Sequence, residues 1–223
     1  MNTKTTDATD RIRLLRDELR PVEPGRAARG TGPGKGICPR ALFELKEFAL
    51  PITVNSGLVI RHVIYVIPTH LVTGVPHPSG LLGEDLQPEP RLFAYPGSDP
   101  ADLVAASDDD PLRCAGGPRG LIDLARSRQR GISKGTERYA HWRRSPGTIR
   151  LRAWERDLAG QDRDAYVQYW GARMTAADAL IHLSGPQLCP VDSSVAAGIR
   201  YAQEANRLLD DLAENTLIIA AEV

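Results

Sequence analysis

The spacing of apolar residues predicts a mainly helical C-terminal half. Apolar side chains recur every three or four residues over residues 162–183 and again over residues 192–214, as they do on the buried face of a helix. We expect these two helices to form an antiparallel pair with Asn206 on the contact line, where a polar residue fixes the register. Two shorter helices are predicted before them, one over residues 120–130 and one capped by Thr136, with a turn over Gly131–Gly135 between them.

Strand patterns lie in the N-terminal half of the body. β-Branched residues flank the turn sequence Asn55-Ser56-Gly57, and the run that ends at Ile67 is apolar enough to be a central strand. A short strand is predicted over residues 92–95, and a short helix capped by Ser98 follows it. The apolar tail at residues 217–221 is expected to dock on the body. The fold class predicted is α+β, with a small antiparallel sheet within residues 37–112 and a mainly helical segment over residues 113–223.

The first 36 residues differ from the rest of the chain. A short amphipathic helix is predicted to end at about Leu19, and half of the sixteen residues from Pro21 to Gly36 are Pro or Gly. Such a composition has no means of burying a core. We therefore expect residues 1–36 to be a flexible arm and residues 37–223 to be a single globular body.

The composition is that of an ordinary globular protein. Of 223 residues 42% are hydrophobic and 25% charged, which excludes a collagen-like or wholly disordered chain. The most apolar run, residues 58–67, is shorter than the ~20 residues that cross a bilayer, and no secretory signal is found at residues 1–10. The three cysteines are far apart and are expected to be free thiols. We expect a cytoplasmic protein that has no contact with membranes.

The charge of the chain is segregated, although its 28 basic and 28 acidic residues balance. Residues 113–156 hold 12 basic and 3 acidic residues, and the stretches on both sides are acidic. This basic block either pairs with the acidic stretches or presents an arginine-rich surface to phosphates or to an acidic protein. Its aromatic residues either stack on unpaired bases or anchor the core. The residues predicted to bind nucleic acid are Arg126, Arg128, Arg130, Lys134, Arg138, Arg143, Arg144, Arg150 and Arg152.

Two patterns point to catalysis without the context that catalysis needs. Gly131-Ile132-Ser133-Lys134-Gly135 has the spacing of a nucleophile elbow, and Asp178 and His182 follow it in hydrolase order, but no strand is predicted before the serine. Another set offers zinc ligands of the right type without zinc-site spacing: His62, His70 and His77 with the cysteines Cys38, Cys114 and Cys189. We therefore predict no catalytic residue, no metal and no cofactor.

The sequence supports three hypotheses about function. The leading one is a non-enzymatic binding or accessory protein that engages nucleic acid or another polyanion through the basic block. The second is a structural or assembly subunit of a bacterial or phage complex, in which charge segregation and Asn206 mediate homo-oligomer or larger assembly. The third is a hydrolase, either a serine enzyme or a metal-dependent one.

Overall fold

The computed structural model describes residues 60–72, 86–107, 109–149, 151, 153–185 and 187–222, without the side chains of 153 and 154. All of them belong to the unit Gly36–Val223. Several predicted features lie outside the described residues: the arm at residues 1–36, the turn Asn55-Ser56-Gly57, and the residues Cys38, His77, Arg150 and Arg152.

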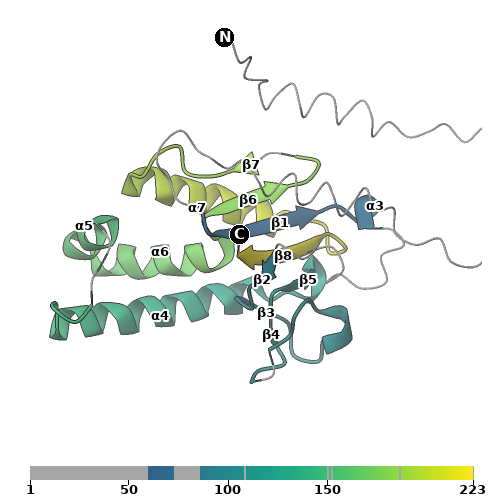
Figure 1. Ribbon diagram of the computed structural model, residues 1–223, viewed down its shortest axis with the longest axis horizontal. Helices are drawn as coiled ribbons and strands as arrows, with labels where there is room; N and C mark the ends of the chain where they lie inside the picture. The colour runs from purple at the N-terminus through teal and green to yellow at the C-terminus, as the bar shows by residue number, and fades with distance from the viewer. Residues whose placement is uncertain are drawn as a thin grey trace, which may run out of the picture. The chain divides into compact units, whose positions relative to one another are not determined.

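A mixed β-sheet lies at the centre of this unit (Figure 1). Strand β1 (His62–Ile67) lies between β8 (Leu217–Glu222), to which it is antiparallel, and β6 (Ala179–His182), to which it is parallel. The side chains of Val63–Ile67 are buried on both faces of the sheet, as expected of an inner strand rich in β-branched residues. The run that ends at Ile67 is thus confirmed as a central strand.

Short strands complete the sheet on both sides. Strand β7 (Gln187–Leu188) pairs with β6, while β2 (Gln87–Pro88) and β5 (Gly116–Pro118) pair with different parts of β8. A separate two-stranded ladder joins β3 (Leu92–Phe93) to β4 (Arg113–Cys114). The short strand predicted near Leu92 is therefore present as β3.

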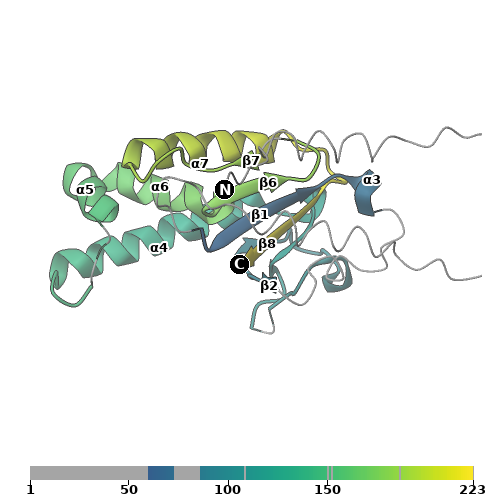
Figure 2. The same ribbon diagram turned by 45° about the horizontal axis from the view of Figure 1, so that its top comes forward.

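Three long helices lie side by side in the order α4, α6, α7 (Figures 1 and 2). They are α4 (Leu124–Arg144), α6 (Arg163–Ala176) and α7 (Val195–Asp210), and the shorter α5 (Ala153–Gln161) connects α4 to α6. They cover one face of the sheet, where they form a core with Ile64 and Val66 of β1. Because side chains alternate along a strand, Val63 and Tyr65 belong to a second core on the other face.

Three one-turn elements lie in the connecting segments: α3 (Thr69–Val72), η2 (Pro100–Asp102) and η3 (Arg119–Leu121). The helix predicted after Ser98 is only the 3₁₀ turn η2, and its cap is Asp99, whose side chain accepts a hydrogen bond from the Ala101 amide at 2.9 Å. Within the described residues, none of the helices is both long enough and apolar enough to cross a bilayer.

The turn predicted at Gly131–Gly135 is wrong, because α4 continues through both glycines. A β-carbon at Gly131 would lie 2.7 Å from the Trp170 carbonyl oxygen, and one at Gly135 would lie 2.7 Å from the Trp170 β-carbon. The glycines therefore allow α4 and α6 to pack closely. Thr136, which was expected to cap a helix, instead donates a hydrogen bond to the Ile132 carbonyl within α4.

The helix predicted over residues 162–183 is also wrong over its last third, residues 177–183. Asp162 caps α6 by accepting hydrogen bonds from the amides of Asp164 and Ala165, as its position suggests. The helix ends at Ala177, whose φ of 59° is incompatible with a right-handed helix, and the chain continues as strand β6. A short apolar run has no period that distinguishes a strand from a buried helix.

The pairing of the last two helices is parallel, not antiparallel. Gly198 lies against Tyr169, and Asn206 hydrogen-bonds to Ala172 and Thr175, so both helices advance in the same direction. The reason is the hairpin of β6 and β7. Strand β7 runs antiparallel to β6 and so returns the chain toward the N-terminal half of α6 before α7 begins.

The α+β class is confirmed, with a small sheet and a mainly helical C-terminal half. The sheet is mixed, however, because β1 is parallel to β6. It also draws β6, β7 and β8 from the half of the chain that was predicted to be helical. The tail that was expected to dock on the body is strand β8, next to β1.

Candidate functional site

Helix α4 has a buried side and a charged side. It begins at Asp123, whose side chain accepts a hydrogen bond from the Arg126 amide at 2.8 Å. Leu124, Ser127, Gly131 and Gly135 are buried against the rest of the unit. The helix carries seven basic residues and one acidic residue, so its net charge is strongly positive.

Four of these cations share one side of the helix. Arg126, Arg130 and Lys134 follow one another at intervals of four residues, and Arg144 lies five turns beyond Arg126. At about 100° per residue, all four fall within a sector of about 80°. We call these four residues the cationic face of α4. Its centre is about 100° from Gly131 and about 140° from Gly135 around the helix, so it lies beside the buried side of α4.

A groove of about 720 Å³ runs beside this face. Three residues of the cationic face, Arg126, Arg130 and Lys134, line it. Arg113, at the start of β4, contributes a fourth cation, and Ser133 also lies in the lining. The charges in its wall are four positive and two negative: Arg113, Arg126, Arg130, Lys134, Asp110 and Glu137.

The cations of the groove differ in how they are held. Arg126 lies 4.0 Å from Asp110 and stacks over the ring of Phe93 at 4.9 Å, so its guanidinium has partners within the chain. Arg113 donates a hydrogen bond to the Pro90 carbonyl at 2.7 Å. Arg130 and Lys134 are exposed, and neither has a carboxylate within 4.0 Å among the described residues.

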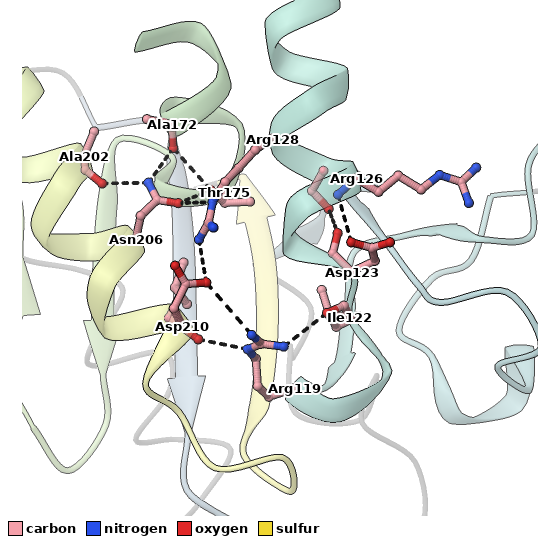
Figure 3. Close-up of polar contacts among 12 residues, drawn as sticks. Arg119, Ile122, Asp123, Arg126, Arg128, Ala172, Thr175, Ala202, Asn206 and Asp210 are labelled. Carbon is pink, nitrogen blue, oxygen red and sulfur yellow. Dashed lines mark hydrogen bonds and ion pairs between the residues drawn. The ribbon is translucent and has the colours of Figure 1, made fainter. Parts of the chain in front are cut away.

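Arg128 does not line the groove; it points into a network between α4 and α7 (Figure 3). Its Nε donates to Asn206 at 2.7 Å, and a terminal nitrogen pairs with Asp210 at 2.8 Å. Arg126 points in the opposite direction (Figure 3). Arg119 reaches the same network, where it donates to the Leu209 carbonyl at 2.9 Å. Arg128 therefore joins helices and does not belong to the cationic face.

Asn206 is the centre of this network. Its side-chain oxygen accepts from Arg128 and, at 2.5 Å, from the hydroxyl of Thr175. Its amide nitrogen donates to the carbonyls of Ala172 at 2.9 Å and Ala202 at 2.6 Å. An asparagine side chain has four hydrogen-bonding positions, and all four are used. The residue predicted on a helix seam thus fixes α4, α6 and α7 within one chain.

Arg138 is also engaged within the chain. Its Nε donates to Glu155 of α5 at 2.8 Å, and that carboxylate is only 2% exposed. The hydrogen bond to Glu155 raises the pKa of Arg138. Because a buried carboxylate without a partner is costly, this pair fastens α5 to α4.

The remaining predicted residues lie at the end of α4. Arg143 and Arg144 are both exposed, and Arg144 donates a long hydrogen bond of 3.4 Å to the Ala140 carbonyl. Arg143 is about 100° from Arg144 around the helix, so it lies outside the cationic face. Arg150 and Arg152 lie outside the described residues.

The aromatic residues near the basic block pack on one another. The ring of Tyr139 lies 5.7 Å from that of Trp142 and 5.9 Å from that of Tyr166, and Tyr166 lies 6.4 Å from Trp170. Tyr139, Trp142 and Trp170 are half-buried against the helical core. Of the two alternatives for these rings, the structure supports the core role.

The hydrolase motif does not have the geometry of a nucleophile elbow. Ser133 lies inside α4, where its hydroxyl donates to the Gln129 carbonyl at 3.2 Å. Asp178 is occupied by an ion pair with Arg173 and by the amides of Arg61 and His62. No group of three His, Cys, Asp or Glu residues suited to a metal occurs in the part of the chain that the structure describes.

A second polar cluster, not predicted from the sequence, closes the end of α6. The guanidinium of Arg91 donates to the carbonyls of Met174 and Arg173 at 2.8 and 2.9 Å and pairs with Glu89 at 3.1 Å. Glu89 lies 3.1 Å from Nδ1 of His62. Burial lowers the pKa of Arg91 from its usual high value. Because its donors satisfy the last carbonyls of a helix, we assign this cluster a structural role.

Comparison with known proteins adds no information about function. No protein-family model, no curated protein and no solved structure matches the chain. The function must therefore be inferred from the chemistry of the residues themselves.

Proposed function

We propose that this chain is a non-enzymatic binding or accessory protein that engages a polyanion, in the first place nucleic acid, through the cationic face of α4 and Arg113. One observation carries the proposal. Arg113, Arg130, Lys134 and Arg144 are exposed, and none of them has a carboxylate within 4.0 Å among the described residues. Each is therefore available to a phosphate, whose condensed counterions would be released on binding.

The internal pairs of α4 strengthen this interpretation. Arg128 and Arg138 use carboxylates of α7 and α5, and both pairs join helices. A stability role therefore accounts for these two arginines and leaves the cationic face unexplained. Exposed charges contribute little to the stability of the fold, about 0–1 kcal/mol for each ion pair. Stability therefore does not explain a row of like charges, whereas binding of an anionic ligand does.

The two other hypotheses have less support. Asn206 saturates its hydrogen bonds inside one chain, so it no longer favours an assembly subunit. The charge segregation, the N-terminal arm predicted from the sequence and the lack of a convincing catalytic motif remain in favour of that hypothesis. Ser133 has no strand before it, as a hydrolase elbow would need. We also propose a cytoplasmic location, on the grounds of the sequence alone.

The proposal is tested by fluorescence anisotropy of the full chain with labelled mixed-sequence DNA and with labelled heparin. The test variant is Arg130→Gln/Lys134→Gln, which removes two exposed cations of α4. The control is Arg200→Gln/Arg207→Gln, which removes two exposed arginines of α7. Each lost phosphate contact weakens duplex binding about eightfold at 0.1 M salt, so the test variant should lose about 60-fold.

The control variant should bind like the native chain. If neither polyanion binds at low salt, or if both variants lose affinity equally, the cationic face is not the binding site. Circular dichroism of both variants checks that the fold is retained.

A further inference from the structure

The cations on α4 form a straight and rigid row. From Arg126 to Arg144 the row is about 27 Å long, at about 1.5 Å per residue. The helix is held over its middle by close contacts with α6, where a β-carbon on Gly171 would meet the Ile132 side chain at 2.7 Å. The spacing of the charges is therefore set before any ligand binds, which lowers the entropic cost of binding to a rigid, regularly charged partner.

Duplex and single-stranded nucleic acids differ in what they present to such a row. A duplex carries one charge per about 1.7 Å of axis, and each strand alone about one per 3.4 Å. Arg126 is held by Asp110 and Phe93, so the free part of the row runs from Arg130 to Arg144 over about 21 Å. It therefore faces about 12 phosphates of a duplex and about 6 of a single strand. A single strand, which offers fewer phosphates, gains comparable affinity when its bases also stack on aromatic rings of the protein.

The rings that contact the cations of α4 are not available for stacking, and Tyr95, which is 46% exposed, does not line the groove. Phe93 is 7% exposed and lies beneath Arg126. Trp170 is half-buried against the helical core and is covered by Arg138, whose guanidinium lies 5.7 Å from the ring centroid. Tyr139 lies beneath Arg163 at 6.0 Å. One described ring on the cationic side of α4 is exposed, the imidazole of His141.

We propose that the ligand of the cationic face is double-stranded nucleic acid, held by its phosphates and without base readout; this inference rests on the proposed function. The row of α4 lies along the duplex, and Arg113 reaches a phosphate from the other side of the groove. Four cations take part, namely Arg113, Arg130, Lys134 and Arg144. Arg126 stays with Asp110 and Phe93.

The test compares three probes on the full chain by fluorescence anisotropy. They are a labelled 24-base-pair DNA duplex of mixed sequence, one of its strands, and labelled heparin. With four phosphates neutralised, the logarithm of affinity should fall with the logarithm of salt with a slope of about −3.6 for the duplex and about −2.8 for the single strand. If both lose their electrostatic affinity at 1 M salt, the duplex binds about sixfold tighter at 0.1 M.

A duplex of scrambled sequence should bind as tightly as the first one, and Arg130→Gln/Lys134→Gln should weaken both far more than Arg200→Gln/Arg207→Gln. A single strand that binds as tightly as the duplex overturns the inference, and so does a strong preference for one duplex sequence. Binding of heparin without binding of the duplex overturns the inference but leaves a polyanion-binding protein. If none of the probes binds, both proposals fail.

Discussion

The contact between α4 and α6 predicts an unusual response to a conservative substitution. In Gly131→Ala, the new β-carbon would lie 2.7 Å from the Trp170 carbonyl oxygen, 2.8 Å from the Met174 β-carbon and 2.9 Å from the Gly171 α-carbon. All three separations are too short for carbon, and two of the atoms belong to the backbone of α6, which has no freedom to turn aside. The two helices must therefore move apart.

The magnitude follows from two opposing effects. Alanine is favoured over glycine inside a helix by about 1 kcal/mol, which stabilises the variant. Overpacking a close contact costs about 1–3 kcal/mol, and this contact belongs at the upper end because it involves backbone atoms. We expect a net loss of about 2 kcal/mol in the free energy of unfolding. For a domain of this size, that loss lowers Tm by about 4–8 °C.

The assay is urea unfolding followed by circular dichroism, with scanning calorimetry for Tm. The matched control is Gly160→Ala in α5, because a β-carbon at Gly160 has no atom within 4 Å. The control should therefore gain up to about 1 kcal/mol from helix propensity alone. If Gly131→Ala is also stabilised, the two helices do not pack as closely as these distances require.

Three further predictions concern other parts of the molecule. Asn206→Leu removes four hydrogen bonds, including one to Arg128, and should lower the free energy of unfolding by about 3 kcal/mol, measured by urea unfolding. Asp110→Asn removes the carboxylate 4.0 Å from Arg126, so duplex affinity should rise and the salt slope should steepen by up to about 0.9; an unchanged slope would contradict this pairing. Burial lowers the pKa of His182 below its ordinary 6.5, so the unfolded chain takes up the proton first and stability is lost as the pH falls below about 6.5; His182→Gln should flatten this loss in unfolding measured from pH 7 to pH 5.

Elements with a clear periodicity of apolar residues could be predicted from the sequence. Elements whose bounds depend on contacts with residues far away in the sequence could not. The pattern over residues 192–214 gave α7, and the apolar run ending at Ile67 gave the central strand β1. The end of α6 depends on one residue, Ala177, whose backbone conformation has no signature in the sequence. The glycines at 131 and 135 suit a turn as well as a close helix contact, and only α6 decides between these alternatives.

The candidate site shows the same division. A count of charges places a basic block at residues 113–156. The count does not distinguish the two arginines that pair within the chain, Arg128 and Arg138, from the exposed Arg130 and Lys134. The reason is that the partners of Arg128 and Arg138 lie up to 82 residues away in the sequence. The four-residue spacing of Arg126, Arg130 and Lys134 was a signal for the cationic face once α4 was known to be continuous. Arg113 has no such signal, because it comes from a different ladder.

The pairing of β1 with β8 has a consequence for how the protein folds. Ile67 pairs with Leu217 and His62 with Glu222, so 150 to 160 residues separate the partners. The long helices all lie within that intervening chain, and their hydrogen bonds are local. Bringing the two strand segments together costs the conformational entropy of closing a very large loop. This cost slows the step that completes the sheet. Helix formation should therefore precede strand pairing, and an early helical intermediate would expose the apolar residues of β1 to other chains.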